Sequence, residues 1–276
     1  MNIVKRIEIP DPNWRDELDH ISNFVNEILS RSGSRGVVIG LSGGVDSSVV
    51  ATLLAHSIEP SKILGVIMPT SFTPREDIED ALWLADHLGI DRALIPIDDI
   101  TDLVTNKVLA TERYLDKMSI ANLRARIRAS ILYLYANARR YLVAGTSDKS
   151  EYILGYFTKY GDGAADFLLI THLYKTQVRR LGRWLGLPER IYAKQASPQL
   201  YPGHKATDEL PADYEILDQI MYALFDLGMK REEVIERLGF SREIVDEIIK
   251  RYKNSYHKRS LPPMPRPLIL REPVEE

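Results

Sequence analysis

The sequence predicts an α/β protein with a doubly wound parallel sheet flanked by helices and a small helical segment at its C-terminal end. Short apolar runs alternate with segments of helical periodicity through residues 14–145. A turn rich in glycine and serine joins the first of these runs to the helix that follows it. Beyond residue 215 only helical patterns and a proline-rich stretch remain.

Each predicted element follows from local apolar spacing and from the residues that end it. The first apolar run is flanked by glycines, which is typical of a strand buried on both faces of a parallel sheet. Pro74 and Gly89 mark the two ends of the third helix. The predicted strands cover residues 36–41, 63–68, 93–97 and 141–145. The predicted helices cover residues 14–31, 47–56, 74–89 and 120–140.

The chain is expected to form one large domain with a helical appendage. Residues 1–200 carry the alternating strands and helices and form the principal domain. Residues 201–215 are polar and interrupted by proline and glycine, which favours a mobile loop at the active site. Residues 216–276 are expected to form C-terminal helices and a proline-rich tail, packed on the same domain.

Composition excludes several classes of function. The 276 residues carry a formal net charge of -3, so no overall positive field attracts nucleic acid, and none is expected as a partner. No apolar stretch is long enough to span a bilayer, so no membrane partner is expected. A cytoplasmic location is expected. Cysteine is absent, which excludes disulfides, thiolate metal sites and a thiol nucleophile in this chain.

The turn after the first predicted strand has the features of a phosphate-binding loop. It lies between a buried strand and a helix start, where backbone N–H groups and the helix dipole attract anions. Gly43 and Gly44 allow close approach of a phosphate, and Ser42 and Ser47 add hydroxyl groups. The lysine of a Walker A loop is missing. Asp46 would repel a polyphosphate unless a divalent cation lay between them, so Mg²⁺ is expected here.

The segment SGGVDS, residues 42–47, resembles the PP-loop of enzymes that split ATP between its α and β phosphates. This resemblance implies a Rossmann-like fold of the adenine nucleotide α-hydrolase type, and ATP as a co-substrate. The loop alone does not select one member of the class, which includes synthetases of NAD, GMP, asparagine and argininosuccinate as well as enzymes that modify tRNA.

A second block, directly after the fourth predicted strand, narrows the choice. Residues 145–166 read GTSDKSEYILGYFTKYGDGAAD, a mixture of acids, bases and glycine turns at the edge where open α/β sheets bind ligands. The block closely resembles the NAD synthetase family. The resemblance continues through NLRARIR, HLYKTQVRRL, KQASPQL and SYHKRSLPPMPR and so covers nearly the whole chain.

The resemblance implies both a reaction and a set of site residues. The reaction is ATP-dependent amidation of deamido-NAD, in which an adenylated intermediate reacts with ammonia to give NAD, AMP and pyrophosphate. The implied metal ligands for Mg²⁺ are Asp46 and Glu151, and the implied catalytic residues are Asp46, Lys175 and Asp166. The implied ATP contacts are Gly40, Leu41, Ser42, Gly43, Gly44, Val45, Asp46, Ser47, Thr146, Lys175 and Ser197. The implied deamido-NAD contacts are Arg126, Lys159, Asp166, His257 and Lys258.

The absence of cysteine also bears on the nitrogen source. The glutaminase domains fused to some such synthetases use a cysteine nucleophile, which this chain lacks. Ammonia is therefore expected to come free from solution or from a separate donor protein. The resemblance also implies a homodimer, and the apolar helix at residues 120–141 is long enough to form its interface.

Two other interpretations remain open from the sequence. Another PP-loop amidating ligase with a different carboxylate substrate would share the phosphate loop. A nucleotide-binding regulator with a helix-turn-helix is the second, because two short helical patterns surround residues 239–241 and a basic run follows them. Acidic side chains on the would-be reading surface argue against DNA binding there, notably Glu232, Glu236 and Asp246.

Overall fold

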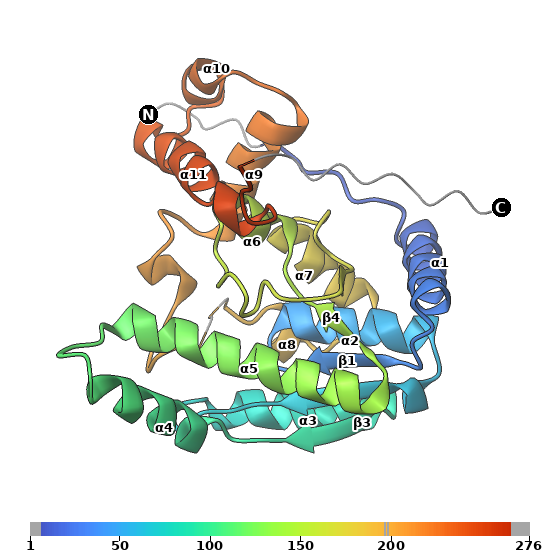
Figure 1. The fold of residues 1–276 in the computed structure, drawn as a ribbon. Helices are drawn as coiled ribbons and strands as arrows, with labels where there is room; N and C mark the ends of the chain where they lie inside the picture. The colour runs from blue at the N-terminus through green and yellow to red at the C-terminus, as the bar shows by residue number, and fades with distance from the viewer. Residues whose placement is uncertain (1–6, 196, 198, 266–276) are drawn as a thin grey trace.

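The computed structural model describes residues 7–195, 197 and 199–265, and its core is a parallel sheet with helices on both faces (Figure 1). The strands are β1 (Val37–Gly40), β2 (Ile63–Ile67), β3 (Asp91–Leu94), β4 (Leu142–Gly145) and β5 (Phe167–Leu168), in the order β3-β2-β1-β4-β5. All neighbouring strands pair in parallel. The doubly wound parallel sheet predicted from the sequence is therefore confirmed.

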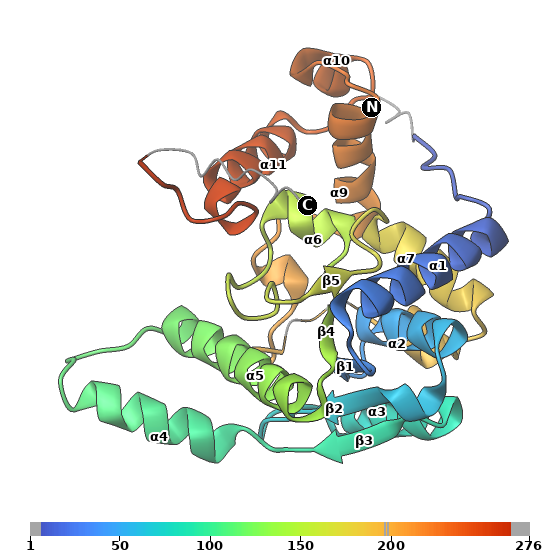
Figure 2. The same ribbon diagram turned by 45° about the vertical axis from the view of Figure 1, so that its right-hand side comes forward.

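Helices cover the sheet in two layers. The helices are α1 (Trp14–Ser32), α2 (Val45–Ser57), α3 (Arg75–Leu88), α4 (Asp98–Leu109), α5 (Lys117–Arg139), α6 (Lys149–Leu154), α7 (Lys175–Trp184), α8 (Glu189–Tyr192), α9 (Tyr214–Met221), α10 (Arg231–Glu236) and α11 (Arg242–Asn254). One apolar cluster joins β1 to α1, α2, α3 and α7, and a second joins the opposite face to α5. Figure 2 shows α5, with α4 beside it, on the side of the sheet away from α1 and α2.

The last three helices form a third apolar cluster at the end of the sheet. Leu217 of α9, Val234 of α10 and Ile248 of α11 are fully buried in it, together with residues of α6. The C-terminal helices therefore stack on α6, which begins soon after β4 (Figure 2). Arg231 is paired with Asp246, so one of the basic side chains that a helix-turn-helix would need for DNA is already engaged.

The third strand differs from its prediction. The apolar run 93–97 is only partly in the strand, which covers Asp91–Leu94. β3 is an edge strand whose register follows its pairing with β2, Leu64 opposite Asp91, and its side chains are mostly exposed. The sequence analysis also did not predict α4 and α7, helices of 12 and 10 residues, or the short elements β5, α6 and α8. Within the described ranges, no helix is long and apolar enough to cross a membrane.

Candidate functional site

A cavity of about 550 Å³ opens at the carboxyl ends of the central strands. Its lining includes the last residues of three of them, Gly40 of β1, Ile67 of β2 and Gly145 of β4. The chain order reverses at β1, which lies between β2 and β4. Open α/β sheets bind ligands at such a reversal, because loops leaving neighbouring strands diverge and leave a crevice. The volume lies within the usual range of small-molecule sites.

The predicted phosphate loop forms one wall of this cavity. Ser42 and Ser47 hold the loop in shape: their hydroxyl oxygens lie 3.1 Å apart, and the Ser42 hydroxyl accepts the N–H of Gly44 at 3.2 Å. Gly44 is the N-cap of α2, and no side chain caps this helix. The positive end of a 13-residue helix is thus left available at the cavity, which is the arrangement that binds phosphate groups.

Gly43 is the tightest point of the loop. Its φ is +76°, and a Cβ there would lie 2.2 Å from the backbone oxygen of Asp77. The carbonyl of Gly43 accepts a hydrogen bond from the Lys194 amine at 3.0 Å, and the same amine pairs with Asp77 at 2.5 Å and Asp80 at 2.7 Å. Gly43 is the one predicted ATP contact of the loop that does not line the cavity; its role is to bring the loop against α3.

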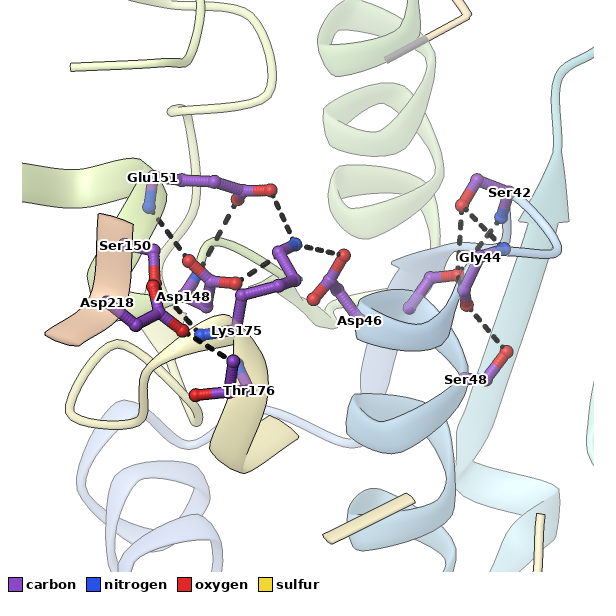
Figure 3. Close-up of polar contacts among 11 residues, drawn as sticks. Ser42, Gly44, Asp46, Ser48, Asp148, Ser150, Glu151, Lys175, Thr176 and Asp218 are labelled. Carbon is purple, nitrogen blue, oxygen red and sulfur yellow. Dashed lines mark hydrogen bonds and ion pairs between the residues drawn. The ribbon is translucent and has the colours of Figure 1, made fainter. Parts of the chain in front are cut away.

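The amine of Lys175 lies at the centre of a cluster of charges. Lys175 is the first residue of α7, and its side chain is 1% exposed. Its Nζ lies 2.7 Å from Asp46, 2.9 Å from Asp148 and 2.8 Å from Glu151. Figure 3 shows these carboxylates converging on the amine from α2 and from the start of α6. The structure thus brings the two predicted metal ligands, Asp46 and Glu151, to one point with a lysine between them.

Burial and the attraction between Lys175 and the carboxylates shift the pKa of each of these groups in opposite directions. Burial disfavours the charged amine, but the three carboxylates outweigh it and hold the pKa of Lys175 well above the ordinary lysine value. Burial raises the pKa of Asp148 to about 6, against the attraction of Lys175 and with repulsion from Asp46. Burial and the neighbouring acids also raise the pKa of Glu151. The cluster carries more acid groups than a single ammonium can neutralise.

This excess of acid fits a divalent cation. Asp46 and Glu151 both line the cavity, and Asp46 Oδ1 is buried without a hydrogen-bond partner among the described residues. Mg²⁺ takes carboxylate oxygens together with phosphate oxygens and water. The described residues contain no group of three or more His, Cys, Asp or Glu placed to hold a metal by protein alone. The two carboxylates of Asp46 and Glu151 are oxygen donors of the kind that Mg²⁺ takes, so the residues present fit that ion.

Two further predicted residues line the cavity, together with two that were not predicted, and a third unpredicted residue lies next to it. Thr146 and Ser197, predicted as ATP contacts, line the cavity. Lys194 and Arg128 also line it, and Asp148 contacts Lys175 from behind, but motif spacing identified none of these three. The basic series in NLRARIR was the available signal for Arg128. Ala125, Arg128 and Leu132 share the helical face of α5 that lines the cavity, at spacings of three and four residues.

Arg128 is half-buried, and its Nε donates to the carbonyl of Met68 at 3.1 Å. Burial, with repulsion from Arg124, lowers the pKa of Arg128 to about 10, still far above neutral pH. Arg128 therefore remains a cation inside the cavity and is suited to an anionic ligand.

The predicted deamido-NAD contacts gather elsewhere. None of Arg126, Lys159, Asp166, His257 and Lys258 lines the cavity. Arg126 donates to the carbonyl of Lys159 at 3.3 Å, and the Lys159 amine donates to the carbonyl of His257 at 2.5 Å. The Lys258 amine donates to the carbonyls of Gly155 and Phe157. These four residues form one group outside the cavity, where α5 meets the loop after α6.

Asp166 lies apart from this group, at the start of the last strand. Its carboxylate accepts the N–H of Val143 at 2.7 Å and the hydroxyl of Tyr133 at 3.3 Å. Tyr133 follows Arg126 by seven residues on α5, so both lie on the same side of that helix. Asp166 therefore supports the edge of the sheet and faces the same outer surface as Arg126.

Comparison with known proteins gives concordant results. A sequence model of the family described as NAD synthase matches residues 17–262. A protein named NH(3)-dependent NAD(+) synthetase from Hyperthermus butylicus is 47% identical over 94% of this chain and 94% of its own length. Among solved structures, an NMN synthetase from Francisella tularensis matches 92% of this chain and 99% of its own, with 30% identity and a TM-score of 0.81. An NH3-dependent NAD synthetase from Campylobacter jejuni has the same identity and coverage, with a TM-score of 0.76.

Proposed function

The chain belongs to the NAD synthase family, and from this membership we propose that its cavity carries out ATP-dependent amidation of deamido-NAD with ammonia. It is thus a carbon–nitrogen ligase that forms NAD, AMP and pyrophosphate. A single observation supports the chemistry most strongly. The uncapped N-terminus of α2 and the buried cluster of Asp46, Glu151 and Lys175 face one cavity, so a polyphosphate and the cations that neutralise it would meet there.

The reaction is proposed to take place in two steps. A carboxylate oxygen of the nicotinic acid group attacks the α-phosphorus of ATP, and the bond to the β-phosphate oxygen breaks to release pyrophosphate. Ammonia then attacks the carbonyl carbon of the acyl adenylate, AMP leaves, and a proton is released as the amide forms. Neither step needs a covalent bond to the enzyme, so catalysis comes from positioning and from neutralising charge.

The residues of the cavity have separate roles in this proposal. The loop from Gly40 to Ser47 would hold the phosphates with backbone N–H groups and hydroxyls, and Thr146 and Ser197, which line the same cavity, would hold the nucleotide. Lys175 directs a permanent positive charge at the reacting phosphate. Asp46 and Glu151 would hold Mg²⁺, which when bound supplies neutralisation of the phosphate charge.

The exposed surface of α4 and α5 supports a homodimer. On α4, Ile100, Leu103 and Val104 are exposed, and their spacing makes one apolar stripe. Leu134 on α5 and Tyr114 between the helices are exposed by 70% and 76%. Large apolar side chains exposed together on neighbouring helices are typical of an interface. We propose that a second copy covers it. Because Arg126 and Tyr133 share the outer side of α5, the dinucleotide would be bound where the two copies meet.

The activity is tested by measuring NAD and pyrophosphate together. Purified protein with ATP, Mg²⁺, ammonium and deamido-NAD is expected to release one pyrophosphate for each NAD formed. Glutamine in place of ammonium is expected to give no NAD, since the chain has no cysteine to hydrolyse it. Nicotinic acid mononucleotide and other carboxylates, offered in parallel, separate this function from that of another amidating ligase. A higher kcat/KM for any of them than for deamido-NAD would refute the proposal.

A further inference from the structure

Asp218, a buried carboxylate outside the cavity, connects the two helices that carry the charged residues of the site. It lies on α9, in the C-terminal segment, and its residue is 0% exposed. Its Oδ1 accepts the hydroxyl of Ser150, on α6, at 2.6 Å. Its Oδ2 accepts the backbone N–H of Thr176, on α7, at 2.9 Å. Figure 3 shows Asp218 and Asp46 on opposite sides of Lys175.

The same network also holds the backbone of Lys175. The Ser150 hydroxyl, which donates to Asp218, accepts the N–H of Lys175 at 2.9 Å. The N–H of Thr176 therefore donates directly to Asp218, and the N–H of Lys175 is linked to Asp218 through the Ser150 hydroxyl. The N-cap residue, Tyr174, makes no side-chain cap bond of its own. Asp218 supplies acceptors that a helix N-terminus needs, from a helix more than forty residues away in the chain.

The network links the start of α7 to the turn that carries Asp148 and Glu151. Ser150 immediately precedes Glu151 and follows Asp148 by two residues, so whatever fixes Ser150 also fixes the turn that carries both acids. Among the described residues, Asp218 makes no hydrogen bond or ion pair with Asp46, Asp148 or Glu151. Besides the repulsion between the Asp218 and Asp148 carboxylates, its hydrogen bonds reach the charge cluster through the backbone of α7 and the short helix α6.

We propose that Asp218 is a positioning residue for the amidation reaction, setting the Lys175 amine and the α6 carboxylates in register through Ser150 and Thr176. The inference rests on the proposed function. A displacement of about 1 Å in a positioned group can reduce a rate by about 100-fold, and the N–H groups at the start of α7 need acceptors to stay in place. The hydroxyl bonds that shape the phosphate loop, between Ser42, Gly44 and Ser47, do not involve Asp218, so we expect the loop to keep its own contacts to ATP, although Lys175 pairs with Asp46 of that loop.

The test is Asp218→Asn, which keeps the shape of the side chain. A carboxamide has an acceptor at only one of the two positions that the carboxylate oxygens occupy, and its NH₂ group would face either Ser150 or the N–H of Thr176 at the other. We expect kcat to fall by about 10- to 100-fold while the KM for ATP changes by less than about threefold. The matched control is Leu217→Ala, the neighbouring fully buried residue of α9. It should lower Tm at least as much and leave kcat within about twofold when assayed below its Tm.

Ser150→Ala provides a second route to the same network and carries the test if Asp218→Asn is not recovered folded. It should reproduce the loss in kcat, and the double variant should lose no more than the larger single effect, since both changes interrupt one path. A kcat for Asp218→Asn within about twofold of wild type, or an equal loss in Leu217→Ala at equal Tm, would overturn the inference. Failure of the proposed function is a separate outcome, in which the wild-type protein itself forms no NAD from deamido-NAD and ammonium.

Discussion

The Lys175 amine lies 2.7 Å from the Asp46 carboxylate, although the two residues are 129 positions apart in the chain. Asp46 comes from the helix after β1 and Lys175 from the helix after β5, so this contact joins the central strand to the edge of the sheet. A lysine that a Walker A loop would carry within its own turn is supplied here by a distant helix. The cation is buried, and three acids keep it charged.

Replacing Lys175 by methionine should lower the free energy of unfolding. Three acids would remain in a buried site without their shared cation, and removal of one partner from a buried ion pair typically costs about 3–5 kcal/mol. We expect a loss of that order in the free energy of unfolding at neutral pH, measured by urea denaturation. The loss should shrink toward pH 5 as the acids take up protons. A variant as stable as wild type at neutral pH would show that the acids do not need this cation.

Asp46→Asn should abolish pyrophosphate release and leave the fold intact. The amide keeps the size of the side chain but removes the charge that a cation beside the phosphates requires. Initial rates with deamido-NAD, ATP, Mg²⁺ and ammonium, together with circular dichroism, would test this. Asp16→Asn, an exposed acid in the first turn of α1, is the matched control and should keep full activity. Retained turnover in Asp46→Asn would contradict the role assigned to Asp46.

Gly43→Ala should disable the phosphate loop. The added Cβ would lie 2.2 Å from the Asp77 carbonyl, and the positive φ adds strain. We expect the KM for ATP to rise by about 10-fold or more, because the loop must move off α3 and lose its shape. Gly33→Ala is the control that distinguishes backbone strain from a steric clash. Gly33 also has a positive φ, but nothing lies within 4 Å of its added Cβ. That control should cost about 1 kcal/mol of stability and leave the KM unchanged.

The titration of Asp218 should appear in the pH dependence of the free energy of unfolding. Burial raises the pKa of Asp218 from 3.8 to about 7, against hydrogen bonds from Ser150 and Thr176. A raised folded-state pKa means that the folded protein holds this proton more tightly than the unfolded chain does. The corresponding stabilisation is present below about pH 4 and is lost as pH rises to about 7, on the order of 4 kcal/mol in total.

Asp218→Asn removes this titration. The difference in unfolding free energy between wild type and variant should therefore shift in favour of the variant as the pH rises from about 4 to about 7. Urea denaturation across that range measures it, and parallel curves for the two proteins would show that Asp218 does not titrate there.

A charge on the α4–α5 surface should separate the proposed dimer. Leu134→Glu and Leu103→Glu each place a carboxylate on an exposed apolar side chain, so the folded monomer should tolerate the change while an interface should not. Light scattering should show the mass halved relative to wild type. Leu227→Glu, which changes an apolar side chain of similar exposure in the C-terminal segment, should not alter the mass. A wild-type protein that is already monomeric would contradict the proposal.

Sequence patterns predicted the architecture well where elements are long and strongly periodic. α1, α3 and α5 lie within a few residues of their predicted bounds, and so do β1, β2 and β4. The edge strand β3 was misplaced by two to three residues, because its register depends on hydrogen bonds to β2 and not on its own apolar run. The short helix α6 was not predicted, because a capping box formed by Asp148 and Glu151 defines it more than any apolar periodicity does.

The sequence by itself determined the phosphate loop, its acid and the block that relates the chain to its family, because these are local patterns that chemistry constrains residue by residue. Only the tertiary structure decided that Lys175 pairs with Asp46, that Arg128 and not Arg126 faces the cavity, and that the predicted deamido-NAD contacts lie outside it. Asp218 is the extreme case. Nothing around it in the sequence distinguishes it from a surface acid, since its partners belong to helices that only folding brings beside α9.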